Sequence, residues 1–311
     1  MSNDYAPIAV FTYNRPDHTF RVLSALDASA LAPKSDLYIF CDNYKNEKAK
    51  ESVNQVRLVV DDFSRRSRFK RTEVIKSETN KGLATSIIDG VSEIMKEYGK
   101  AIVVEDDMLA SPHFLEFMND ALDFYKDNQL IWSISGYSFP IKILEKYPHD
   151  VYMAGRGCCW GWGSWIDRWN LVDWDVSDYP QFKHNWVKRF KFGRWGRDLP
   201  IMLDNQMYSN HQSWAIRWCY SEFTNKMLTV YPSISYIQNI GNDGSGVHES
   251  VALKKYDTVL ENNERYCCRL ENLGVNNALR KEFAAKYYMN PWKNFKQEVR
   301  WLLIRLGIIK V

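Results

Sequence analysis

Several features that define common protein classes are missing from this sequence. No glycine-rich GxGxxG or GxxxxGK loop follows the first predicted strand, residues 8–12, which disfavours a dinucleotide site or a P-loop. No stretch reaches the roughly 18–20 apolar residues that a membrane-spanning helix needs. The first residues lack a basic region followed by an apolar core, so we expect no signal peptide. The net charge of +3 does not by itself indicate a nucleic-acid partner, and we expect none.

Cysteine is also used sparingly. The six cysteines include two adjacent pairs, Cys158–Cys159 and Cys267–Cys268, and nowhere form the CxxC spacing of a zinc site. They show no disulfide framework either. The sequence therefore predicts a cytosolic protein with reduced thiols.

Aromatic residues are abundant, with 12 tryptophans and 18 tyrosines. Aromatic rings often line sugar-binding surfaces, because a flat ring packs on the C–H face of a pyranose, but they also fill cores. From about residue 154 the chain alternates glycine with tryptophan. Two interpretations stay open for this segment: tight loops that present flat apolar faces to a ligand, or a packed aromatic corner.

The first half of the chain alternates strand and helix patterns. This alternation predicts an α/β fold with a mainly parallel central sheet and helices on both faces. In such sheets, ligands bind beyond the carboxyl ends of the strands. The expected strands are 8–12, 37–41, 72–75 and 101–104, and the expected helices are 17–30, 46–63 and 83–98.

The expected strand 101–104 ends in three acids, Glu105, Asp106 and Asp107. Carboxylates this close raise one another's pKa unless a cation lies among them. A hard divalent ion with oxygen ligands, Mn²⁺ or Mg²⁺, fits this role, and a nucleotide diphosphate is the partner on which such an ion would act. The alternative is a solvated strand end that happens to be acidic.

The end of the chain is basic and amphipathic. Residues 280–311 carry eight basic and two acidic side chains. This pattern is typical of a helix that lies on a membrane surface, and a terminal helix docked on the core is the alternative. The apolar residues at helical spacing are Trp292, Phe295, Val299, Leu302, Leu303, Leu306 and Ile309.

Seven short motifs, in order, resemble those of GT-A-fold glycosyltransferases, in particular bacterial sugar transferases distantly similar to N-acetylglucosaminyltransferase I. The resemblance implies a Rossmann-like GT-A domain over 1–250, with a nucleotide-binding half at about 1–110 and an acceptor half at about 111–250. Residues 251–311 would form a C-terminal helical extension that could anchor the protein to a membrane surface. The motifs are Phe11–Pro16, Phe40–Asp42, Asn80–Leu83, Val104–Asp107, Trp160–Trp162, Ser213–Trp218 and Asn239–His248.

The resemblance also implies roles for single residues. Asp107, the last acid of a DXD-type element, would bind the metal, and His248 would be a second metal ligand or a diphosphate contact. Asp42 would hydrogen-bond the base, which is uracil if the donor is UDP-linked. The remaining nucleotide contacts would be Thr12, Tyr13, Asn14, Arg15, Asn80, Lys81, Gly82, Glu105 and Asp106.

A further group would shape the pocket for the donor sugar or the acceptor: Arg156, Trp160, Trp162, Trp165 and Arg217. The position that aligns with the family's catalytic base is Ala215, a departure from the pattern. Asp204 is the first candidate for the base, and Asp173, Asp175 and Glu222 are alternatives. Asp167 is followed by Arg168, which indicates an ion pair.

These features together predict a metal-dependent enzyme, which we expect to be inverting. It would move a hexosyl or N-acetylhexosaminyl group from a nucleotide-sugar, UDP-linked in our expectation, to a hydroxyl of a lipid-linked glycan. It would act in bacterial surface polysaccharide synthesis, peripheral on the inner face of the cell membrane. The alternatives are a carbohydrate- or nucleotide-sugar-binding protein without catalysis, and a nucleotidyltransferase.

Overall fold

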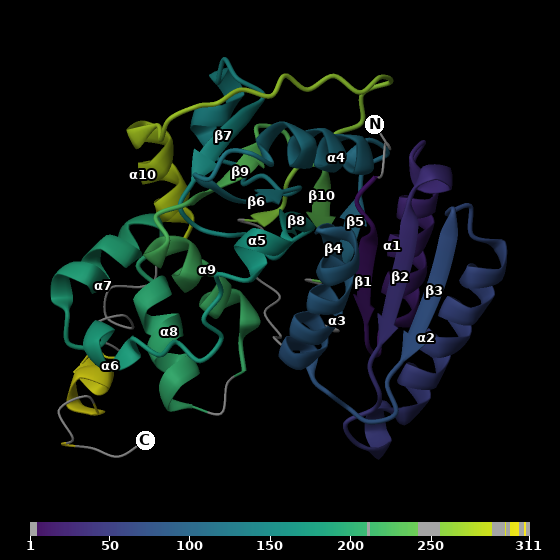
Figure 1. Ribbon diagram of the computed structural model, residues 1–311, viewed down its shortest axis with the longest axis horizontal. Helices are drawn as coiled ribbons and strands as arrows, with labels where there is room; N and C mark the ends of the chain where they lie inside the picture. The colour runs from purple at the N-terminus through teal and green to yellow at the C-terminus, as the bar shows by residue number, and fades with distance from the viewer. Residues whose placement is uncertain are drawn as a thin grey trace.

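The computed structural model describes residues 5–209, 212–241, 256–287, 296, 299–304 and 308. Its centre is an eight-stranded, mostly parallel sheet with the strand order β3-β2-β1-β4-β8-β6-β9-β7 (Figure 1). The first four strands in the chain lie side by side at one end of the sheet and are all parallel. They are β1 (Ile8–Thr12), β2 (Asp36–Cys41), β3 (Arg71–Lys76) and β4 (Lys100–Glu105). The expected α/β class with flanking helices is confirmed.

Helices cover both faces of this parallel half because successive residues of a buried strand point to opposite faces. In β1, Ile8 and Val10 pack in the cluster that holds Val22 and Val56, whereas Ala9 and Phe11 pack in the cluster that holds Ile87. One face therefore carries α1 (Pro16–Asp27) and α2 (Glu47–Arg66), and the other carries α3 (Leu83–Tyr98).

The other half of the sheet is mixed. Strand β8 (Trp162–Trp165) runs antiparallel between β4 and β6 (Ile131–Ser135). Strand β9 (Leu228–Pro232) is parallel to β6, and β7 (Val151–Ala154) closes the edge antiparallel to β9. The remaining elements of this part are α4 (Phe114–Tyr125), the two-stranded pair β5 (Met108–Ala110) and β10 (Ile237–Asn239), and the short 3-10 helix Lys142–Lys146. Another 3-10 helix, Ala32–Lys34, precedes β2 in the parallel half.

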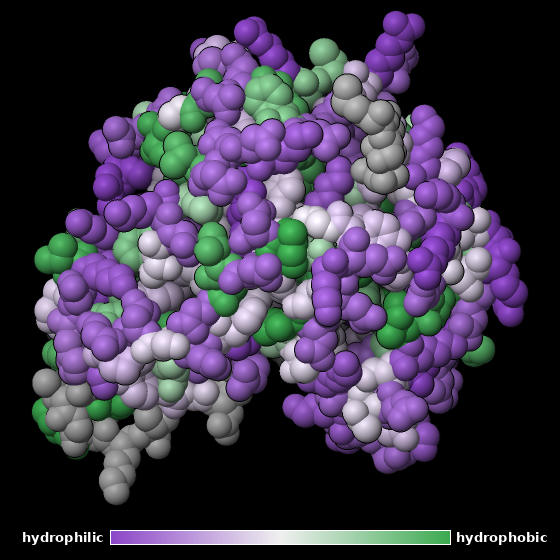
Figure 2. Space-filling view, viewed as in Figure 1, coloured by the Kyte–Doolittle hydropathy of each residue, from purple (hydrophilic) through white to green (hydrophobic). Residues whose placement is uncertain are grey.

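A helical lobe follows β8 and lies at the far side of the molecule from α1 and α2 (Figure 1). Figure 2, drawn from the same side, shows a notch between this lobe and the parallel half at their lower edge. The lobe consists of α5 (Ile166–Trp169), α6 (Tyr179–Phe182), α7 (Trp186–Phe192), the 3-10 helix η3 (Gly193–Trp195), α8 (Leu199–Tyr208) and α9 (Trp214–Thr224).

The described part of the C-terminal extension packs on the domain. Helix α10 (Asn277–Lys286) places Leu279 and Phe283, both fully buried, in the main core. The segment before it crosses the domain and is held by the Tyr125 hydroxyl, which donates to the Glu271 carbonyl at 2.6 Å. Residues 256–287 are therefore integrated into the domain by their contacts.

The described piece of the final helix, residues 299–304, docks on α8. Trp301 and Ile304 are buried against Ile201, and Trp301 stacks on Tyr208 with 5.4 Å between ring centres. This contact supports the docked interpretation of the terminal helix for these residues. Within the described ranges, none of the helices combines the length and apolar character that a bilayer crossing requires.

Candidate active site

The pairing of β1 with β4 brings two predicted motifs together at one edge of the sheet. Arg15 follows β1, and its Nη2 lies 2.5 Å from Asp106 Oδ1 and 3.0 Å from Asp107 Oδ2. The backbone N–H of Tyr13 donates to Asp106 Oδ2 at 3.3 Å. The acids after β4 are thus held by the segment after β1, as strand-end geometry predicts.

Burial and the neighbouring charges shift the pKa values of this cluster in opposite directions. Burial, together with the nearby carboxylates of Asp107 and Asp106, raises the pKa of Glu105 to about 8, although Arg15 opposes the shift. Burial also raises the pKa of Asp106, although the Arg15 guanidinium opposes the shift. Burial alone would lower the pKa of Arg15, but Asp106 and Asp107 outweigh it and raise that pKa, so Arg15 stays charged.

The segment after β10 closes over Asp107. The N–H of Ile240 donates to the Asp107 carbonyl at 2.9 Å, and His18 Nε2 lies 3.2 Å from the Ile240 carbonyl. A Cβ atom on Gly241 would lie 2.3 Å from Asp107 Oδ2, so only glycine fits there without a shift. The chain leads from Gly241 into the expected glycine-rich loop, whose His248 lies outside the described residues.

Asp107 is suited to a hard cation. Its Oδ1 is buried and has no hydrogen-bond partner, whereas buried carboxylate oxygens are normally satisfied. Oxygen ligands of this kind are those that Mg²⁺ and Mn²⁺ prefer. The described residues contain no group of three or more His, Cys, Asp and Glu side chains arranged to hold a metal. Asp107 is therefore the ligand that the described chain offers best.

The motifs after β2 and β3 also meet, as predicted, but Asp42 differs from its expected role. Its Oδ1 accepts from the N–H of Lys81 at 2.9 Å and of Asn43 at 2.8 Å. Its Oδ2 accepts from the N–H of Gly82 at 2.9 Å and from Asn80 Nδ2 at 3.0 Å. A carboxylate has about four acceptor positions. All are used within the chain, so the structure gives Asp42 the role of fixing the loop rather than reading a base directly.

A cleft of about 380 Å³ lies beside this loop, at the carboxyl ends of β2 and β3. Asp42, Ser77 and Lys81 contribute to its lining. Thr12 does not face it freely, because this buried side chain donates to the Phe40 carbonyl at 3.2 Å. The expected nucleotide contact of the Thr12 side chain is therefore not supported, whereas Asn14 remains half-buried beside Tyr13 and Arg15.

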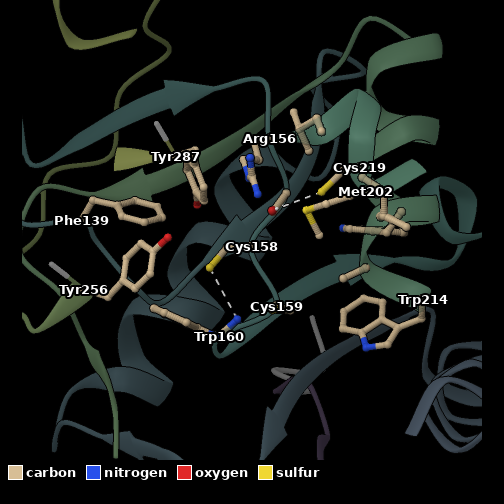
Figure 3. Close-up of a pocket in the computed structure, with 15 residues that line it drawn as sticks. Phe139, Arg156, Cys158, Cys159, Trp160, Met202, Trp214, Cys219, Tyr256 and Tyr287 are labelled. Atoms are coloured by element: carbon tan, nitrogen blue, oxygen red, sulfur yellow. Dashed lines mark hydrogen bonds between the residues drawn. The ribbon is translucent and has the colours of Figure 1, made fainter. Parts of the chain in front are cut away.

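A second, smaller pocket of about 180 Å³ lies between the loop after β7 and helices α8 and α9 (Figure 3). At one side, the two terminal nitrogens of Arg156 donate to the two oxygens of Asp198 at 2.8 and 2.9 Å. The Arg156 guanidinium also lies 3.4 Å from the centre of the Tyr287 ring. The other lining residues are Phe139, Gly157, Cys158, Cys159, Trp160, Leu199, Met202, Trp214, Ala215, Ile216, Trp218, Cys219 and Tyr256.

Cys159 connects this pocket to the acidic cluster. Burial raises the pKa of its thiol well above the ordinary value, and the charges of Glu105 and Asp107 raise it further, which places both acids within its electrostatic reach. Cys159 therefore lines the pocket and lies near the strand-end acids. Ala215 lines the pocket with a methyl group, and no carboxylate is among the described residues that line it.

Two of the expected pocket residues lie in the core instead. Trp162 is fully buried in the core, where it stacks on Trp214 and Trp169, and Trp165 is 6% exposed and donates to the Leu122 carbonyl. Their place in a central strand points them into the sheet faces, so the expectation that they touch sugar is wrong. Trp160 and Arg156, by contrast, do line the pocket.

Arg217 likewise braces the chain. Its Nε donates to the Ser213 carbonyl at 3.1 Å and its Nη1 to the Trp174 carbonyl at 3.0 Å. The guanidinium also lies over the Trp174 ring. We therefore assign Arg217 a structural role, and it is not among the residues that line the pocket.

Asp204 is not available as a base. It is fully buried, and Arg189 donates to both its oxygens at 2.8 and 2.7 Å, while the Tyr179 hydroxyl donates to Oδ1 at 2.8 Å. A carboxylate held in this way has no path to a substrate hydroxyl. This first choice from the sequence is wrong, because the sequence does not show the partner on the neighbouring helix.

The alternative bases do not line the pocket either. Asp173 and Asp175 are exposed, and the oxygens of Asp173 accept backbone N–H groups within their own turn. Glu222 is fully buried below Gly157, and burial raises its pKa well above 4.5, which favours its neutral form. The base is therefore unassigned among the described residues.

Sequence reasoning missed Asp198, Gly241, Tyr256 and Tyr287. Asp198 pairs with Arg156 across 42 residues of chain, and no local pattern predicts such a partner. Tyr287 belongs to the segment that the sequence assigned to an extension. The glycine-rich texture after Asn239 is the only signal that could have indicated Gly241.

Neither a family model nor a curated protein matches the chain. Among solved structures, TarS of S. aureus (residues 1–349) is similar at 12% identity with a TM-score of 0.38, over 74% of this chain and 59% of that one. The mannosyltransferase PcManGT from Pyrobaculum calidifontis, solved in complex with GDP-Man and Mn²⁺, is similar at 8% identity with a TM-score of 0.37, over 72% and 71%. The chain thus spans less than two thirds of the first of these proteins. At such scores, the fold assignment rests on the strand order itself.

Proposed function

We propose that the protein is a metal-dependent glycosyltransferase that uses a nucleotide-sugar, UDP-linked in our expectation. The observation that carries the proposal is the meeting of Arg15, Asp106 and Asp107 under Gly241, beside a pocket lined by aromatic rings. The cleft and the charged cluster lie at the carboxyl edge of a mostly parallel sheet, where α/β folds bind ligands.

Each of the three parts suits a different portion of a nucleotide-sugar donor. The 380 Å³ cleft beside Asp42 suits a nucleoside, and the strand-end cluster suits the diphosphate. The 180 Å³ pocket suits one sugar ring, of the donor or of the acceptor. Because aromatic and thiol groups dominate its lining and Arg156 is already paired, the pocket favours a neutral ring over an acidic one.

Asp107 would hold Mn²⁺ or Mg²⁺ through its unsatisfied Oδ1, with His248 as a second ligand or a diphosphate contact in our proposal. A bound ion of this kind supplies Lewis-acid stabilisation of a departing diphosphate. Arg15 keeps Asp107 and Asp106 in place and adds a fixed positive charge at the same edge.

The acceptor in this proposal is a hydroxyl of a lipid-linked glycan in bacterial surface polysaccharide synthesis, on the inner face of the membrane. Transfer of a hexosyl or N-acetylhexosaminyl group would invert the anomeric centre. Inversion needs a group that takes the hydroxyl proton on the face opposite the leaving group. The described pocket lining offers no carboxylate for this step, so we place the base in another part of the site.

The test is donor turnover by the purified protein. We expect release of the nucleotide from one of the UDP-, GDP- or CMP-sugars in the presence of Mn²⁺, and the true donor should also raise the melting temperature. Asp107→Asn should lower this turnover at least about 100-fold. The matched control is Asp62→Asn, which alters an exposed ion pair with Arg66 on α2 and should leave turnover unchanged. Full activity of Asp107→Asn would remove the metal role.

A second candidate is a sugar- or nucleotide-sugar-binding protein without catalysis. Ala215 and the pocket lining without a carboxylate favour it. The two candidates separate in one experiment. Saturable binding of a nucleotide-sugar, with no product from any acceptor and no hydrolysis, would support the binding protein and contradict the enzyme.

A further inference from the structure

Helix α7 (Trp186–Phe192) has an inner face that fixes it firmly to the lobe. Arg189 forms the buried bidentate pair with Asp204, and Phe192 is buried in the core of the lobe. Lys188 lies at the boundary and pairs with Asp178. These contacts hold the helix in one orientation, so its outer face is set by the fold.

The outer face is apolar and exposed. Trp186 is 58% exposed, Val187 65% and Phe190 75%. Residues three and four positions apart are neighbours on one side of a helix, and Phe190 follows Val187 by three positions and Trp186 by four, so both border Phe190 in one patch. The other exposed large apolar side chains of the described chain lie singly along the sequence. In Figure 2, apolar residues lie beside strongly hydrophilic ones at the left edge of the molecule, where Figure 1 places α7.

The segment that contains the patch is rich in basic residues. Between residues 179 and 197 the sequence holds six basic residues and no acid. Lys188 and Arg189 are paired as described above. Among the described residues, no acid lies within ion-pair distance of the other four, which are Lys183, Lys191, Arg194 and Arg197.

We propose that α7 is a membrane-contact element that inserts Trp186, Val187 and Phe190 into the headgroup region of an anionic bilayer. Helices with aromatic and aliphatic residues on one side and Lys or Arg around them lie in this interface. The cations add attraction to anionic headgroups, and their long side chains reach those groups while the apolar residues are buried. A protein partner is the less favoured occupant, because the four cations, close to the patch in sequence and without an ion pair among the described residues, favour a strongly negative surface.

The position of α7 gives this contact a consequence for the pocket. Five residues separate the end of α7 from Asp198, which holds Arg156, and the next residue, Leu199, lines the pocket. A bilayer at α7 therefore lies one helix away from the pocket wall. The inference does not rest on the proposed reaction, because vesicle binding is measured without any sugar.

The experiment is sedimentation of the full chain with vesicles of phosphatidylcholine, with and without phosphatidylglycerol. We expect binding to the anionic vesicles, and the double variant Trp186→Ser/Phe190→Ser should lower the apparent affinity about tenfold or more. Lys191→Gln/Arg194→Gln should also weaken binding and reduce its salt dependence. The control Leu58→Ser/Leu130→Ser removes two apolar side chains of similar exposure elsewhere, at 67% and 66%, and should bind like the unaltered chain.

Three outcomes would overturn the proposal. They are no binding of the unaltered chain to anionic vesicles, equal binding by the Trp186→Ser/Phe190→Ser variant, and an equal loss in the Leu58→Ser/Leu130→Ser control. A change in the sedimentation coefficient of the protein alone on altering Trp186 and Phe190, with vesicle binding intact, would instead assign the patch to contact between copies of the chain. Donor turnover measured in the same preparations stays unchanged if only the membrane contact is lost.

Discussion

The residues that stand out in the sequence lie at the edge of the sheet in its parallel half, whereas in and beside the helical lobe they are buried in the core. In the parallel half, Arg15, Asp107 and Asn80 follow strands and meet at one edge, close to where the sequence places them. In the lobe and the strand beside it, Trp162 and Asp204 are buried in the core. Strand ends in a parallel sheet collect their residues at one edge whatever the side chain, whereas a residue inside a strand or helix has a face that depends on its neighbours.

The largest expected effect is a loss of stability, and it should distinguish buried Trp162 from Trp160 at the pocket. Trp162→Ala removes a fully buried side chain and should lower the free energy of unfolding by about 3–5 kcal/mol. Trp160→Ala, at the pocket, should cost less stability and instead raise the KM for the sugar substrate up to about tenfold. Urea unfolding and kinetics measure the two effects, and a stable, low-affinity Trp162→Ala would reverse the assignment.

Asp204→Ala tests the structural role of the residue that the sequence proposed as base. Removing it leaves Arg189 buried without its partner, which should destabilise the protein by about 3–5 kcal/mol. Asp61→Ala, which breaks the exposed pair with Lys76, should cost about 0–1 kcal/mol. If Asp204→Ala kept normal stability and lost only turnover, Asp204 would be the base after all.

Replacing Asp42 tests whether this residue holds the loop in place or recognises the nucleotide base directly. Asp42→Ala leaves the N–H groups of Lys81 and Gly82 without their acceptor and should cost about 1–3 kcal/mol. Because the loop beside the cleft loosens, uridine, guanosine and cytidine diphosphates should all bind more weakly by a similar factor. Calorimetry with the three nucleotides measures this, and a selective loss of one would show direct reading of the base.

The last prediction concerns pH. Burial raises the pKa of Glu222 well above 4.5, so the folded state holds its proton at pH values where the unfolded chain has released it. Stability is therefore lost as the pH rises above 4.5, up to the folded-state pKa. Glu222→Gln, which cannot ionise, should lose less stability than the unaltered chain between pH 5 and pH 8, in denaturant titrations at each pH. Identical pH profiles would contradict the neutral form of Glu222.

The sequence predicted the parallel half well because its apolar runs are short and bounded by polar residues. The expected strands 72–75 and 101–104 correspond to β3 and β4, each with one more residue at both ends. Adjacent residues also predicted the ion pair of Asp167 with Arg168. Trp160 and Arg156 line a pocket, and the sugar contact that the resemblance implies for them stays a prediction.

The rest was beyond the sequence for physical reasons. The pairs Arg156–Asp198 and Arg189–Asp204 join different loops and helices, and their charges look like ordinary surface charges until the chain is folded. The strand β8 is four residues long and rich in tryptophan and glycine, so its alternation cannot be told from a loop. The amphipathic pattern near the C-terminus favoured a membrane anchor there, yet its described residues Trp301 and Ile304 pack on α8.

The Arg15 side chain between Asp106 and Asp107 gives the protein a counter-charge of its own. A cluster that is neutralised in part by the chain can fold without an inorganic ion, so in the proposed enzyme folding of the domain and binding of the cation would be separate events. A strong chelator should then abolish the activity of the protein without unfolding it, and adding the ion back should restore the activity without a refolding step.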